Sequence, residues 1–224
     1  MKTQAVKSSN SYKLMLFHPE FKTVGYVEPW ASVSDIEAEP MLFSASFDFA
    51  REKGGSLTQK CLDVIEPIVL KNTIHVIDTK SVMLMPGMYP SIPGWHCDGV
   101  IRAKDGDQPD ISKMNRDVLH YIVMISSDEN GVSNTRLLSE RVQLEIDPNR
   151  VWGSLNEELE KKDPLSVCVP DGRVVRFTQD TPHRAEPAHS KGWRFFFRCS
   201  EYHMPPMNKI RHQVQVYTTP QNGW

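Results

Sequence analysis

The sequence lacks the features that mark membrane and secreted proteins. Among its 224 residues, no stretch approaches the roughly 20 consecutive apolar residues that a membrane-spanning helix requires. Residues 1–12, MKTQAVKSSNSY, contain no apolar segment of the kind found in a secretory signal. We therefore expect a cytoplasmic protein with no membrane partner.

Closely spaced cysteine pairs are also missing. The four cysteines are far apart in the sequence and form no CxxC motif: Cys61, Cys97, Cys168 and Cys199. This spacing argues against a zinc ribbon and against a small disulfide-bonded scaffold. Reduced thiols are expected.

The chain has no excess of charge of either sign. It contains 26 Lys and Arg against 28 Asp and Glu, a formal net charge of −2. A protein that binds nucleic acid mainly by electrostatic attraction needs many basic residues on one face, so nucleic acid is not the expected partner. The overall charge does not exclude a local basic groove. A small molecule is the default partner, and the 39% of hydrophobic residues suit a packed globular core.

Hydrophobic periodicity predicts mainly β-structure with some helix. Apolar residues recur at a helical spacing in residues 56–70, and a mostly charged surface helix is expected at 155–162. Predicted strands are more numerous: 81–85, 118–126, 136–146, 166–169, 173–177, 193–199 and 213–218. The two strands that flank the turn Pro170-Asp171-Gly172 are predicted to form a hairpin. Late strands after an early helix predict a β-sandwich or jelly roll with a helical buttress.

The segment Pro93-Gly94-Trp95-His96-Cys97-Asp98-Gly99 carries the first chemical signal. In an extended chain, residues i and i+2 point to the same side, so His96 and Asp98 can reach one metal ion while Cys97 points away. Imidazole and carboxylate are the ligands of the two-His-one-carboxylate triad of non-haem Fe(II) enzymes.

The third ligand must come from elsewhere in the chain. His183, in the loop before the aromatic strand 193–199, is the preferred candidate. His189 is the rival, because it lies nearer that strand. Three ligands on one face would leave positions for a bidentate 2-oxo acid and dioxygen.

A 2-oxo diacid also needs a cation for its far carboxylate, and the planar fork of arginine suits this role. Arg194 and Arg198 share one face of the strand 193–199 by parity, so either could face the cavity. With His189 as the ligand, Arg198 would have the better spacing. Tyr121, in the strand 118–126, could hydrogen-bond a carboxylate of 2-oxoglutarate or could equally pack in the core.

Taken together, these residues resemble the Fe(II)/2-oxoglutarate-dependent dioxygenase superfamily. The order is His96-x-Asp98, a long gap, His183, ten intervening residues and Arg194, and the stretch 183–194 is most similar to the phytanoyl-CoA-hydroxylase-like branch. The resemblance implies a cupin-like double-stranded β-helix, Fe(II), 2-oxoglutarate and O2, with succinate and CO2 as co-products. It implies metal roles for His96, Asp98 and His183, and a 2-oxoglutarate role for Arg194.

The expected organisation is one structural unit. Residues 1–80 form an N-terminal extension with a supporting helix, residues 81–203 form the catalytic core, and residues 204–224 form a C-terminal strand or tail. The expected reaction is hydroxylation or another oxidation of a small organic substrate. The alternatives are a cupin-like metalloenzyme that does not use 2-oxoglutarate, a 2-oxoglutarate oxygenase acting on a protein side chain or nucleobase, and a non-catalytic β-sandwich binding module.

Overall fold

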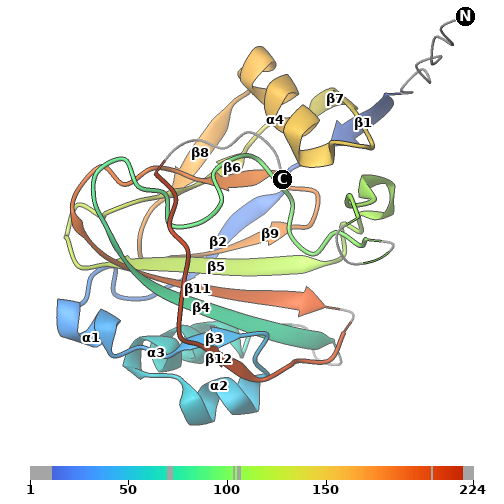
Figure 1. The fold of residues 1–224 in the computed structure, drawn as a ribbon. Coiled ribbons are helices and arrows are strands. Elements are labelled where there is room, and N and C mark those ends of the chain that lie inside the picture. Colours follow the sequence, from blue (N-terminus) through green and yellow to red (C-terminus); the bar gives the residue numbers. More distant parts are fainter. Residues whose placement is uncertain (1–11, 70–72, 103, 105–106, 203, 219–224) are drawn as a thin grey trace, which may run out of the picture.

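Two antiparallel sheets form the centre of the molecule (Figure 1). The computed structural model describes residues 12–69, 73–102, 104, 107–202 and 204–218. The larger sheet has the strand order β2-β9-β5-β11-β4, and its members are β2 (Phe21–Tyr26), β4 (Ile74–Leu84), β5 (Leu119–Ser126), β9 (Arg173–Thr178) and β11 (Gly192–Tyr202). The smaller has the order β10-β6-β8, and its members are β6 (Thr135–Leu138), β8 (Ser166–Val169) and β10 (His183–Ala185).

Three helices cover the outer face of the larger sheet (Figure 1). They are α1 (Val33–Glu37), α2 (Phe47–Lys53) and α3 (Ser56–Ile65). The serines Ser32 and Ser46 cap α1 and α2 by accepting hydrogen bonds from backbone N–H groups of the first turn. The apolar side of α3, including Leu57 and Ile65, packs against the sheet, which accounts for its helical hydrophobic period.

The alternation along β5 and β11 decides which side chains face the helices and which face the second sheet. Val123 and Phe197 lie in the core beneath the helices. Ile122 and Phe177 lie in a separate core together with Leu137 of the smaller sheet. The space between the sheets therefore receives only every second residue of each strand.

Two further strand pairs flank the sheets. β1 (Lys13–Phe17) pairs with β7 (Val142–Ile146), and β12 (Lys209–Arg211) pairs with β3 (Met41–Phe43). The helix α4 (Val151–Lys162) packs on the first pair, and a single 3-10 turn lies at Ile111–Lys113. No helix in the described ranges has both the length and the apolar character needed to cross a membrane.

The structure confirms a mainly β architecture with helices and corrects several details. The predicted hairpin is wrong: β8 pairs with β6, whereas β9 pairs with β5 and β2. Gly172 has φ +74°, and its N–H donates to the carbonyl of Met124 at 2.8 Å. The turn before β9 therefore docks on β5 and carries the chain from one sheet to the other.

The boundaries of several other elements also differ from those predicted from the sequence. The predicted strand 136–146 is two strands, β6 and β7, and α4 begins at Val151 with a buried first half rather than forming a charged surface helix. Residues 213–218 form one bridge, Tyr217 to Tyr89, instead of a strand. Residue 80, the expected end of the N-terminal extension, lies inside β4, and residues 12–69 and 73–80 contribute strands as well as helices.

Candidate metal centre

His96 and Asp98 follow β4 in an extended segment held by α4. The side chain of Asn156 in α4 accepts a hydrogen bond from the N–H of Trp95 at 2.7 Å and donates to its carbonyl at 3.1 Å. Cys97 is buried in the core beside α4, while His96 and Asp98 line a cavity between the sheets. As the sequence predicts, His96 and Asp98 therefore point to one side of the segment and Cys97 points to the other.

The backbone joins His183 directly to His96. His96 N–H donates to His183 O at 3.0 Å, and His183 N–H donates to His96 O at 2.9 Å. This antiparallel bridge places the two imidazole rings 4.6 Å apart between centroids. Since β10 also pairs with β6, the smaller sheet fixes the position of His183.

Three potential ligand atoms converge at this bridge. One atom each from His96, Asp98 and His183 lies within 4.8 Å of the other two, as a common metal ion would require. The Nε2 atoms of His96 and His183 lie 3.9 Å and 3.4 Å from carboxylate oxygens of Asp98. Nδ1 of His96 lies 3.0 Å from Gly94 O, and Nδ1 of His183 lies 3.1 Å from Thr181 O. If each Nδ1 carries the proton, each Nε2 presents a lone pair to the centre.

The protonation states suit cation binding. Burial, together with the neighbouring His183, lowers the pKa of His96 to about 4, so its imidazole is neutral near pH 7. Burial would raise the pKa of Asp98, but Arg198, with His183 and His96, holds it well below its usual value. The site thus offers a neutral imidazole and an ionised carboxylate.

His189, the rival third ligand, lies elsewhere. Its side chain is exposed in the loop before β11, and its backbone N–H donates to Val132 O at 3.0 Å. The described residues that could share a metal ion with His96 and Asp98 include His183 and not His189.

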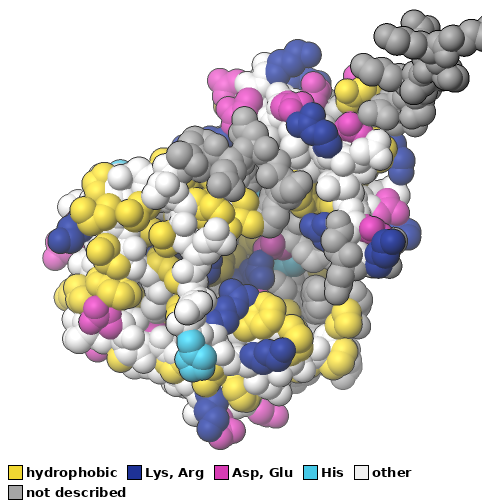
Figure 2. Space-filling model, in the orientation of Figure 1, with side chains coloured by type: hydrophobic (Ala, Val, Ile, Leu, Met, Phe, Trp, Pro, Cys, Tyr) yellow, Lys and Arg dark blue, Asp and Glu magenta, His cyan; other side chains and the backbone are white. Residues whose placement is uncertain are grey.

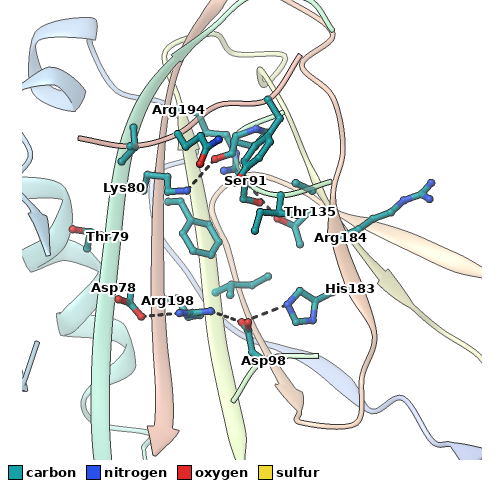
Figure 3. A pocket seen from close by; sticks show the side chains of 18 of the residues that line it. Asp78, Thr79, Lys80, Ser91, Asp98, Thr135, His183, Arg184, Arg194 and Arg198 are labelled. Atoms are coloured by element: carbon teal, nitrogen blue, oxygen red, sulfur yellow. Dashed lines mark hydrogen bonds and ion pairs between the residues drawn. The ribbon is translucent and has the colours of Figure 1, made fainter. Parts of the chain in front are cut away.

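The triad lies on the wall of a cavity of about 490 Å³ between the sheets. Figure 3 shows Asp98 and His183 at this wall. Figure 2 shows a hollow near the middle of this face, with Lys or Arg side chains in and around it. Arg194, Phe196 and Arg198 all line the cavity, so the parity expected for β11 is correct and both arginines face inward.

The two arginines have different partners. Arg198 donates through Nη1 to Asp98 and through Nη2 to Oδ2 of Asp78, the latter at 2.8 Å. Arg194 is 3% exposed and donates to Ser133 O at 3.1 Å and to Thr135 Oγ1 at 3.2 Å. In the described part of the chain, no carboxylate lies within ion-pair distance of Arg194, and burial lowers its pKa to about 10. Arg194 is therefore the guanidinium that can accept an anion from the cavity.

Tyr121 does not reach the cavity. It is 1% exposed in the core beneath the helices, whereas its neighbour Ile122 lines the cavity. Of the two roles left open for Tyr121, its position fits the packing role in the core, because the inward face of β5 carries the even-numbered residues.

Two charged residues of the cavity were not identified from the sequence. Asp78 and Lys80 both lie on the inward face of β4. Their signal was available as Asp-Thr-Lys in the middle of the otherwise mostly apolar strand IHVIDTKSVML. A charged pair at i and i+2 within a buried strand indicates an inward polar site.

Comparison with known proteins gives little further guidance. Neither a protein-family model nor a curated protein matches the sequence. Among solved structures, the chain is similar to an N-substituted L-amino acid dioxygenase from Burkholderia ambifaria, with a TM-score of 0.37 and 10% identity over 81% of this chain and 76% of that chain. A likeness this weak leaves the functional assignment to the chemistry of the site.

Proposed function

We propose that this protein is an Fe(II)- and 2-oxoglutarate-dependent dioxygenase that oxidises a small organic molecule. One observation carries the proposal: two imidazole nitrogens and a carboxylate converge on the wall of a cavity that also contains a buried arginine, which forms no ion pair with a carboxylate in the described part of the chain. Such a cavity offers a metal site and a carboxylate site together.

The donor set fits Fe(II). Two neutral imidazoles and one carboxylate form the facial ligand set of non-haem iron enzymes. Their Nδ1 atoms are held by the carbonyls of Gly94 and Thr181, which orients both rings before a metal arrives. Asp98 is held in turn by Arg198.

Arg194 fits the far carboxylate of 2-oxoglutarate. Ser133 O and Thr135 Oγ1 hold two of its nitrogens, so the guanidinium is oriented before an anion enters. Iron and 2-oxoglutarate together would supply the oxidising chemistry: one atom of O2 enters the substrate as a hydroxyl group, and the other enters 2-oxoglutarate as it loses CO2 and becomes succinate. The chain itself binds, orients and encloses the reactants.

We also propose that the two sheets form a double-stranded β-helix. Its larger sheet is β4-β11-β5-β9, with β2 added beside β9, and its smaller sheet adds the His96 segment to β10-β6-β8. Each crossing, such as the one at Gly172, carries the chain between sheets as a jelly roll requires. The proposed metal ligands then lie on neighbouring strands of the smaller sheet.

Binding measurements test the proposal directly. Purified protein freed of metal should bind one Mn(II), used as a surrogate for Fe(II), and should bind 2-oxoglutarate only when the metal is present. His96→Ala, Asp98→Ala and His183→Ala should each lose both activities, whereas the matched control His189→Ala should retain them. Stoichiometric metal binding that survives in the His96→Ala, Asp98→Ala double variant would contradict the ligand assignment.

Turnover distinguishes the alternatives. The iron-loaded protein should form succinate from 2-oxoglutarate slowly even without a substrate. Complete absence of succinate from protein that holds iron would favour a cupin-like metalloenzyme in which Arg194 binds the substrate. A cavity of about 490 Å³ lies within the range of roughly 300–1,000 Å³ usual for small-molecule sites, so it has room for a small organic substrate.

A further inference from the structure

The ammonium group of Lys80 lies in the cavity and has one hydrogen-bond acceptor among the described residues. Lys80 is on the inward face of β4, directly opposite Phe196 of β11 in the sheet register. Its Nζ donates to the carbonyl of Pro90 at 3.0 Å. Within the part of the chain that the structure describes, no carboxylate forms an ion pair with it.

The cavity holds more positive than negative charge. Its cations are Lys80, Arg184, Arg194, Arg198 and Arg211, and its carboxylates are Asp78 and Asp98. Arg198 binds both of these carboxylates, and Arg184 is paired outside the cavity by glutamates. Arg211 has Asp78 at 3.7 Å as its ion-pair partner and lies over the ring of Phe43. Among the described residues, Lys80 and Arg194 form no ion pair with a carboxylate, and Asp78 and Asp171 act on them only from a longer distance.

Bound metal and 2-oxoglutarate would not remove this excess. The metal adds two positive charges, which the two carboxylates of 2-oxoglutarate offset. Lys80 would then stay near the guanidinium groups of Arg194, Arg211 and Arg198. Burial, followed by these three cations, lowers its pKa to about 8, with Asp78 acting in the opposite direction. A partly buried cation with more cations than anions near it becomes more favourable when a further anion binds.

Lys80 and Arg194 lie near each other on adjacent strands of the larger sheet, because Arg194 is opposite Val82 in the register, but their side chains bind different acceptors. Arg194 is fixed by Ser133 and Thr135, at the start of β6. Lys80 donates to the carbonyl of Pro90, and residues 90–92 line the cavity together with residues of the C-terminal segment 211–217. Figure 3 shows both cations at a distance from the row formed by Asp78, Arg198, Asp98 and His183. The two cations therefore have separate acceptors, and each keeps its own contact when an anion binds the other.

The C-terminal segment 211–217 covers the Lys80 side of the cavity. β12 attaches one end of the segment to β3, and two backbone hydrogen bonds between Tyr217 and Tyr89, at 2.7 and 3.1 Å, attach the other. Gln213, Val214 and Gln215 between these attachments line the cavity. A ligand bound to Lys80 would lie under this segment.

We propose that the primary substrate is a small organic anion whose acidic group binds Lys80 beneath residues 211–217, while Arg194 holds 2-oxoglutarate. This inference rests on the proposed function, because it assigns 2-oxoglutarate to Arg194. It names the substrate class as a carboxylate or a similar organic acid, and it makes Lys80 the residue that selects this class.

Paired probes that differ only in charge test the inference. Protein loaded with Mn(II) and 2-oxoglutarate under anaerobic conditions is titrated calorimetrically at pH 7 with benzoate, benzamide, acetate and acetamide. At least one of the two acids should bind more tightly than its amide. Lys80→Met should weaken binding of that acid by about tenfold or more, as expected for loss of a charge-assisted hydrogen bond, and should leave the amide unchanged.

Two further variants control the experiment. Lys80→Arg keeps the charge and should retain acid binding. Lys60→Met removes an exposed lysine from α3, on the far side of the sheet, and should change nothing. The inference is overturned if neither acid binds better than its amide, if Lys80→Met leaves acid binding intact, or if it weakens 2-oxoglutarate instead. Failure of the proposed function would be seen separately, as absence of metal-dependent 2-oxoglutarate binding to the unaltered protein.

Discussion

Arg198 holds the carboxylate of Asp98, the central residue of the candidate metal triad. Nη1 of Arg198 donates to Oδ2 of Asp98, and Nη2 donates to Oδ2 of Asp78. Asp78, on β4, thus holds the guanidinium of Arg198 in place, and the guanidinium in turn orients the carboxylate of Asp98.

This arrangement predicts that Arg198 affects metal binding, whereas Arg194 affects 2-oxoglutarate binding. Arg198→Gln should weaken Mn(II) binding by about 10–100-fold, because the loss of a group that orients a ligand usually costs this much. Arg194→Met should leave Mn(II) affinity within about twofold but abolish 2-oxoglutarate binding, since Arg194 has no contact with the triad. Calorimetric titration of each variant with each ligand measures both effects. If both variants lost affinity for Mn(II) and for 2-oxoglutarate to the same extent, the separate roles of Arg194 and Arg198 would be contradicted.

Tyr121 and Thr135 make a second contrasting pair. Tyr121→Phe should leave 2-oxoglutarate affinity unchanged, because Tyr121 lies in the core beneath the helices. Thr135→Val should weaken 2-oxoglutarate binding by about fivefold, since Arg194 loses one of its two acceptors. A larger loss for Tyr121→Phe than for Thr135→Val in the same titration would refute this placement.

Lys80 should make stability depend on pH in the alkaline range. Its pKa is about 8 in the folded protein against an ordinary value of 10.5, because of burial and the nearby Arg194, Arg211 and Arg198, with Asp78 acting in the opposite direction. Between these pH values the unfolded chain binds a proton at Lys80 that the folded chain has released. The contribution of Lys80 to the free energy of unfolding therefore rises from about pH 8 to about pH 10.5.

Urea unfolding of the unaltered protein and of Lys80→Met at pH 7, 8, 9 and 10 checks this sign. The stability of the unaltered protein relative to the variant should increase with pH across the series. Parallel curves, or a difference that shrinks as the pH rises, would show that Lys80 is not held among cations in the folded state.

Gly172 should be sensitive to substitution for two reasons. Its φ is +74°, and an added Cβ would lie 2.7 Å from Val27 O and 2.9 Å from Pro29 Cβ. Gly172→Ala should destabilise the protein by at least about 1–3 kcal/mol, the usual cost of this backbone conformation alone. Gly87 is a matched control, with φ +87° and open space around its Cβ position, so Gly87→Ala should cost less. Thermal unfolding of both variants measures the difference, and equal costs would show that the contacts at Gly172 contribute nothing.

Much of the candidate site could be predicted from the sequence because it depends on local geometry. The spacing of His96 and Asp98 places both on one side of an extended chain, whatever the chain packs against. The same parity places Arg194 and Arg198 on one face of β11. In each case, the relationship lies within a few residues of a single strand.

The sequence could not decide questions that depend on how strands meet. His183, rather than His189, joins the triad because its backbone pairs with that of His96. Tyr121 lies in the core because the helices cover the odd-numbered face of β5, and no local pattern specifies which face a helix covers. The hairpin prediction failed because the turn at Gly172 docks on β5.

The sequence by itself therefore determined the ligand types and their local spacing, since side-chain alternation is a property of any extended strand. Only the tertiary structure decided which distant residues complete the site: His183, Asp78 and Lys80. The physical reason is that pairing between strands distant in sequence sets which faces meet across the cavity, and this pairing depends on the whole packed core rather than on any one segment.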